Sequence, residues 1–98
     1  MRQVIVRYKV KQDRIAENVA YIERTFAELV KAQPAGIQYA SFQYADGRFT
    51  HVALLERAGL LQEVPAFRAF VENIRERCDE PPVNEEVTLV GSYGMFQR

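Results

Sequence analysis

The chain has 98 residues, of which 48% are hydrophobic and 27% charged, a composition typical of one globular domain. A second hydrophobic core would need roughly another hundred residues, so we expect a single domain over residues 1–98. Thirteen Lys and Arg residues balance thirteen Asp and Glu residues, and the zero net charge argues against a nucleic-acid or membrane partner. The sequence has neither a membrane-length apolar run nor a signal peptide, which predicts a cytoplasmic protein.

The first part of the chain predicts a strand followed by a helix. Apolar and polar side chains alternate from Val4 to Lys11, which is typical of a strand. Apolar residues then recur at steps of three and four, which predicts an amphipathic helix from Asp13 to about Lys31, with Asp13 as its N-cap. Pro34 and Gly36 mark the end of this helix.

A hairpin is predicted next. The segment from Ile37 to Tyr44 is rich in aromatic and apolar residues, as is the segment from Phe49 to Glu56. Between them, Asp46-Gly47 is a strong signal for a two-residue hairpin turn. We therefore expect two antiparallel strands.

The last third predicts a second helix and a fourth strand. Pro65 suits a first helical turn, and an apolar stripe continues from there to about Cys78, where Pro81-Pro82 stops the helix. The segment from Val83 to Phe96 is rich in β-branched and aromatic residues and predicts a strand, in which Gly91 and Gly94 indicate bulges.

The order βαββαβ predicts an α+β fold, the ferredoxin-like plait: one four-stranded antiparallel sheet with both helices on one face. Two helices cover only one face of such a sheet, yet the strands carry apolar side chains on both. Ile5 lies opposite Val4 in facing, and Val52 lies opposite Phe49. We therefore expect a homodimer in which a second copy covers the free face.

The chain resembles the small proteins grouped with antibiotic-biosynthesis monooxygenases in the dimeric α+β barrel superfamily. The resemblance covers nearly the whole chain and is one of order and spacing: Val4 to Lys11, Gly36 to Tyr39, Asp46 to Val52, Pro65 to Phe70 and Arg77 to Val83. It implies a barrel formed by two sheets across a dimer, and a small-molecule pocket between the helices and sheet of each protomer. Members include cofactor-independent oxygenases of phenol- or quinol-like substrates, haem-degrading enzymes and isomerases. Oxygenases of this group commonly use a pocket Trp, which this chain lacks.

His51 is the only histidine and the first candidate for catalysis. Its unperturbed pKa lies near 6.5, so it is a suitable general base for a phenol or enol, whose anion can react with O₂ without a cofactor. The alternative is a hydrogen-bonded histidine with a purely structural role.

Tyr8, Tyr39 and Arg7 are the other candidate catalytic residues. The two tyrosines lie on strands expected to flank that of His51, where a phenol can hydrogen-bond a substrate oxygen, although strand packing also explains them. Arg7 is a candidate partner of a substrate enolate; the alternative is an ion pair with Glu85, Glu86 or Glu56.

Other polar residues support no separate site. Asn18 on the first helix is a candidate donor to an oxyanion, but we expect it to be exposed, and we expect Arg77 on a solvated helix face. Cys78 is expected to be a buried free thiol facing the sheet. One His and one Cys give no ligand spacing of diagnostic value, so no metal and no cofactor is predicted.

Three hypotheses follow. The first is a homodimer resembling cofactor-independent monooxygenases, with a small aromatic ligand and His51 as general base. The second is a non-catalytic ligand-binding or structural dimer. The third is a proton-transfer enzyme that uses His51 without oxygen. A pocket that holds His51 with a tyrosine hydroxyl would favour chemistry, whereas His51 enclosed between two sheets would favour a structural role.

Overall fold

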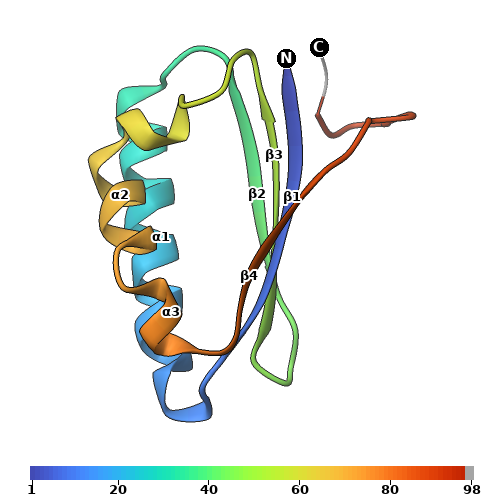
Figure 1. Cartoon of the computed structure of the whole chain (residues 1–98). Helices are drawn as coiled ribbons and strands as arrows, with labels where there is room; N and C mark the ends of the chain where they lie inside the picture. The colour runs from blue at the N-terminus through green and yellow to red at the C-terminus, as the bar shows by residue number, and fades with distance from the viewer. Residues whose placement is uncertain (97–98) are drawn as a thin grey trace.

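A computed structural model describes residues 1–96 (Figure 1). Its elements are β1 (Arg2–Val10), η1 (Gln12–Arg14), α1 (Ile15–Ala32), β2 (Ile37–Gln43), β3 (Arg48–Leu55), η2 (Leu61–Glu63), α2 (Pro65–Val71), α3 (Ile74–Arg77) and β4 (Cys78–Glu86). The strands form one antiparallel sheet in the order β2-β3-β1-β4, and the helices lie together on one of its faces. The predicted ferredoxin-like plait is confirmed.

Strand register decides which side chains face the helices. Val6 of β1 and Ser41 of β2 both lie opposite His51 of β3, so these three side chains share a face. The buried core is on that face, and its strand residues are Val4, Tyr8, Val10, Phe49, Ala53, Leu55 and Cys78. His51 therefore lies between the sheet and the helices, and not on the face left free for a second copy.

The first helix begins later than predicted. Asp13 lies in the short 3-10 turn η1 and its side chain does not cap a helix; α1 starts at Ile15. Arg14 holds this end of the helix instead, through an ion pair with Glu17 at 2.6 Å. At the other end the backbone enters the left-handed region at Gln33, before Pro34, and the Gln33 N–H donates to the Leu29 carbonyl.

The predicted β2–β3 hairpin is confirmed, with bounds one residue from those expected. Its loop runs from Tyr44 to Gly47 and is longer than the two-residue turn predicted from Asp46-Gly47. Gly47 has a positive φ of 91°, and an added Cβ would lie 3.1 Å from the Val10 carbonyl oxygen, so glycine is required here.

The second helical segment was predicted as one helix to Cys78, and this is wrong. Asn73 adopts a left-handed conformation with φ of 62°, which separates α2 from α3. Cys78 then begins β4, so it is a strand residue. Pro81 and Pro82 lie within β4, where the register with β1 shifts between Arg7 and Lys9. Proline has no backbone N–H to donate to a neighbouring strand. It is tolerated here because β4 is an edge strand and neither proline is directly paired with a residue of β1.

The fourth strand was also predicted to extend too far. It ends at Glu86, and residues 87–96 follow without regular structure; residues 97 and 98 are outside the described part. This segment is attached to β1 at Gln3, whose backbone carbonyl accepts the Val87 N–H and whose side chain accepts the Leu89 N–H. Within residues 1–96 no helix is both long and apolar enough to span a bilayer.

Candidate functional site

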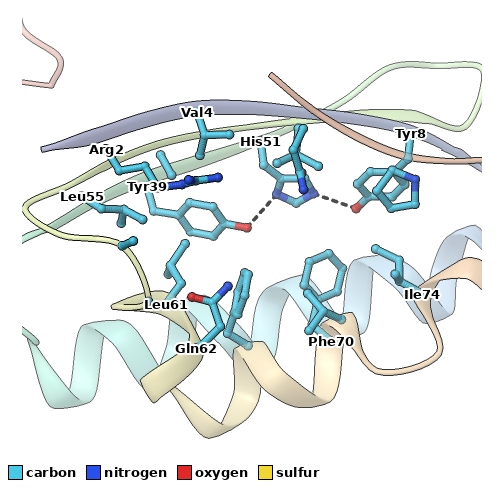
Figure 2. A pocket seen from close by; sticks show the side chains of 18 of the residues that line it. Arg2, Val4, Tyr8, Tyr39, His51, Leu55, Leu61, Gln62, Phe70 and Ile74 are labelled. Atoms are coloured by element: carbon cyan, nitrogen blue, oxygen red, sulfur yellow. Dashed lines mark hydrogen bonds between the residues drawn. The ribbon is translucent and has the colours of Figure 1, made fainter. Parts of the chain in front are cut away.

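A pocket of about 500 Å³ lies between the sheet and the helices α2 and α3 (Figure 2). Its walls are largely aliphatic and aromatic, and its polar groups come mainly from β1, β2 and β3. The principal lining residues are Val4, Val6, Tyr8, Tyr39, His51, Leu55, Leu61, Phe67, Phe70 and Ile74. In the described part of the chain, Arg2 and Arg75 are the only charged residues among those that line it. An apolar pocket of this size with few polar groups is typical of a small-molecule site.

His51 lies at the centre of this pocket's sheet wall. Its residue is only 3% exposed, and both ring nitrogens are hydrogen-bonded. Nε2 lies 2.7 Å from the Tyr8 hydroxyl, while Nδ1 lies 3.0 Å from the Tyr39 hydroxyl and 2.5 Å from Ser41 Oγ. Figure 2 shows the two tyrosines on either side of the imidazole.

Strand pairing brings these three rings together. Tyr8 and Tyr39 are each two residues along from the residue directly opposite His51, a diagonal position within reach of an aromatic side chain. The imidazole is nearly parallel to both phenol rings, with centroids 5.3 Å from Tyr8 and 5.7 Å from Tyr39. The structure thus places three of the four predicted site residues in contact.

Arg7 is the fourth, and the structure does not bring it to the pocket. It lies on the opposite face of β1, with its side chain 60% exposed and paired to Glu85 at 2.5 Å. Alternation along the strand explains this placement, because Tyr8 is the adjacent residue and faces the helices. The ion pair held as the alternative is the one formed, and we leave Arg7 out of the candidate site.

Asn18 and Arg77 extend the polar group, although both were expected at the surface. Asn18 is 0% exposed and its Nδ2 donates to the Tyr8 hydroxyl at 3.0 Å. Arg77 is 1% exposed, and it donates to Asn18 Oδ1 at 3.2 Å and to the Phe70 carbonyl at 2.7 Å. Both expectations of exposure are therefore wrong.

A sequence signal for Asn18 existed. It lies three residues after Ile15 and four before Ile22, which places it on the apolar stripe of α1. A polar residue inside such a stripe faces the core and requires a buried partner. Arg77 had no comparable signal, because its burial depends on the break at Asn73, which redirects the chain before β4.

Burial sets the ionisation of the site. It lowers the pKa of His51 from 6.5 to about 4, and it raises the pKa of Tyr8 and of Tyr39 well above the ordinary value for a phenol. At neutral pH the imidazole and both phenols are therefore uncharged. Together, His51, Tyr8 and Tyr39 can accept a proton at one imidazole nitrogen and donate hydrogen bonds from the two phenol hydroxyls.

Cys78 lies at the start of β4, in the same buried core as Tyr8. It is a buried free thiol, and burial raises its pKa, so it is not an activated nucleophile. Within residues 1–96 no three His, Cys, Asp or Glu side chains are grouped as metal ligands would be.

Solved structures with this fold carry names that match the resemblance seen in sequence. A candidate antibiotic biosynthesis monooxygenase of Nitrosomonas europaea is similar with a TM-score of 0.76 and 16% identity, over 93% of this chain and 100% of that one. An antibiotic biosynthesis monooxygenase is similar with a TM-score of 0.73 and 17% identity, over 93% of this chain and 100% of that one. A candidate monooxygenase of the same kind from Caulobacter crescentus is similar with a TM-score of 0.71 and 18% identity, over 91% of this chain and 89% of that one.

No protein-family model matches the chain, and no curated protein matches it in sequence. At the identities of the solved structures, the likeness establishes a shared fold. The structural resemblance to antibiotic-biosynthesis-monooxygenase proteins is thus confirmed at that level, while activity and substrate have to be argued from the site.

The lowered pKa of His51 predicts that the free energy of unfolding depends on pH. The folded-state pKa is about 4 and the ordinary value is 6.5, so between these pH values the unfolded chain takes up a proton that the folded chain does not. The buried neutral His51 makes its full contribution to the free energy of unfolding above pH 6.5. This contribution falls by about 3 kcal/mol as the pH decreases to 4. Urea unfolding of wild type and His51→Gln at pH 7.5 and pH 4 measures it. We expect the variant to lose about 3 kcal/mol less than wild type on acidification; equal losses would contradict a buried neutral imidazole.

Proposed function

We propose that the chain binds a small aromatic compound in this pocket and removes the proton of its phenolic or enolic hydroxyl, as a cofactor-independent monooxygenase does. One observation carries the proposal: a neutral imidazole with a phenol hydroxyl on each side lines a largely apolar cavity. This is the arrangement that favours chemistry over a purely structural histidine.

The walls support an aromatic ligand. Phe67 and Phe70 pack edge-to-face against each other and line the pocket beside the His51 group, with ring centroids 6.2 Å from Tyr39 for Phe67 and 5.4 Å from His51 for Phe70. Flat aromatic ligands pack well against such faces and edges. A cavity of about 500 Å³ accommodates a compound of a few fused rings.

The polar groups support proton removal. A neutral imidazole can accept a proton, and the phenols, whose pKa values are raised, remain protonated and can donate to the resulting anion. In the described part of the chain no carboxylate lines the pocket, so no negative side chain opposes that anion. An electron-rich anion of this kind can react directly with O₂, which the substrate itself reduces by four electrons. A C–H carbon of the substrate becomes a carbonyl that holds one oxygen atom, and two substrate hydrogens leave with the other oxygen atom as water.

A non-catalytic ligand-binding role is the second candidate, and one observation favours it. Both ring nitrogens of His51 already have protein partners, and its pKa of about 4 makes it a weak base toward an ordinary phenol. The difference between the pKa of His51 and that of the substrate is smaller when conjugation lowers the pKa of the substrate hydroxyl. Ligand binding without oxygen uptake distinguishes this second function from the first.

A panel of naphthols, quinols and anthrone-type enols tests the proposed activity. We expect at least one compound to bind by calorimetry and to give oxygen uptake in an oxygen electrode. His51→Gln removes the base and should reduce that uptake about 100-fold. The control is Glu23→Gln on exposed α1, which lies away from the pocket and from the free sheet face and should leave uptake unchanged. Failure of every compound to bind would contradict the proposal, and binding without uptake would support the non-catalytic role.

We also propose that the chain forms a homodimer through the sheet face turned away from the helices. That face includes Ile5 and Val52, which pair directly across β1 and β3, and two apolar side chains with large exposed fractions, Phe42 at 48% and Val83 at 53%. Figure 1 shows that no helix covers this side. Exposed apolar area of this kind favours association.

Sedimentation velocity at micromolar concentration tests the dimer. Wild type should sediment as a dimer, and Val52→Lys should sediment as a monomer because it places a charge at the centre of the face. Glu23→Lys on exposed α1 is the control and should remain dimeric. A monomeric wild type would contradict the proposed association.

A further inference from the structure

The contacts of Asn18 fix which way its amide points. The Arg77 guanidinium only donates hydrogen bonds, so the group 3.2 Å from its Nε must be the amide oxygen of Asn18. The Asn18 NH₂ group then faces Tyr8 and donates to its hydroxyl oxygen at 3.0 Å. Asn18 is fully buried and Arg77 is 1% exposed, so water does not compete for these bonds.

This orientation favours one arrangement of the protons at Tyr8 and His51, in which Tyr8 donates to the imidazole. The Tyr8 oxygen accepts from Asn18, and its own single proton has the His51 Nε2 at 2.7 Å as its acceptor. Nε2 is then the unprotonated ring nitrogen. A neutral imidazole has one N–H, so Nδ1 carries the proton and donates toward Ser41 Oγ at 2.5 Å.

The same tautomer sets the role of Tyr39. The Tyr39 hydroxyl lies 3.0 Å from Nδ1, which carries the proton, so the Tyr39 oxygen accepts there. The Tyr39 proton is then left to donate into the pocket that this residue lines.

We infer that Asn18 and Arg77 are positioning residues that hold His51 in its Nδ1–H tautomer and so give the two tyrosines different roles. The roles of the two tyrosines in proton removal rest on the proposed function, whereas the tautomer of His51 does not. The ligand's hydroxyl proton moves to the Tyr8 oxygen as the Tyr8 proton moves to Nε2, which leaves a ligand anion, a neutral Tyr8 and an imidazolium. Tyr39 donates a hydrogen bond to that anion. Neither Asn18 nor Arg77 contacts the ligand in this scheme.

Nitrogen NMR of the imidazole tests the inference directly. His51 is the only histidine in the chain, so long-range proton–nitrogen correlation spectra contain one imidazole pattern. At pH 7, without ligand, wild type should show a protonated Nδ1 and an unprotonated Nε2. The opposite pattern, or an equal mixture, would overturn the inference without requiring any variant.

Asn18→Asp provides the decisive variant. The Asp carboxylate beside Arg77 only accepts, so the Tyr8 hydroxyl should donate to it and the Tyr8 oxygen should accept from Nε2–H. The protonated nitrogen of His51 should therefore change from Nδ1 to Nε2. Asn18→Asp made in a Tyr8→Phe background should produce no such change, because the linking hydroxyl is gone. An unchanged tautomer in Asn18→Asp would overturn the inference.

Ligand titration separates this result from the proposed function. If a phenol binds wild type, Asn18→Asp should bind it about tenfold more weakly, because the hydroxyl that receives the ligand's proton now points to position 18. If no phenol binds, the proposed function fails while the tautomer assignment still stands or falls by the nitrogen spectrum. Should Asn18→Asp fail to fold, the wild-type spectrum alone decides the assignment.

Discussion

The polar groups of the site depend on one constraint: each polar atom enclosed between the sheet and the helices must have a partner. A buried donor or acceptor left unpaired costs about 1–3 kcal/mol, so a histidine placed at the centre of an apolar layer requires neighbours on both ring nitrogens. Tyr8 and Tyr39 provide them from the two strands beside β3. Within residues 1–96 no buried side-chain nitrogen or oxygen lacks a partner. Each of these buried polar atoms therefore has a protein partner before any ligand arrives.

Arg77 connects this network to the rest of the fold. Its guanidinium lies over the Tyr21 ring at 4.6 Å, and its carbonyl accepts the Lys11 N–H at 2.7 Å. Within the described residues Arg77 forms no ion pair with a carboxylate. Its positive charge is stabilised instead by hydrogen bonds to an amide oxygen and a carbonyl and by stacking on aromatic faces. Such contacts stabilise a buried guanidinium because it is weakly hydrated and planar. The same residue, at the end of α3, thus contacts α1, α2 and the residue that follows β1, and it orients Asn18.

Alternation and apolar periodicity were sufficient to predict the element order and the plait. They were also sufficient to select Tyr8 and Tyr39 as candidates, because both lie on strands adjacent to β3. The bounds near Cys78 were not predictable in this way. Pro81-Pro82 normally ends a helix, but here Asn73 ends it earlier by adopting a left-handed backbone, and the prolines lie at a bulge in an edge strand. Arg7 was chosen for its charge, and only strand facing shows that it lies on the other side.

The neutral state of His51 is the central claim, since proton acceptance, the roles of the two tyrosines and the acid sensitivity of the fold all follow from it. Titration of its Cε1–H resonance by NMR between pH 7.5 and pH 3.5 measures that state directly. A buried, neutral imidazole predicts a single transition with a pKa of about 4. A transition near 6.5, the value of a solvent-exposed imidazole, would contradict it.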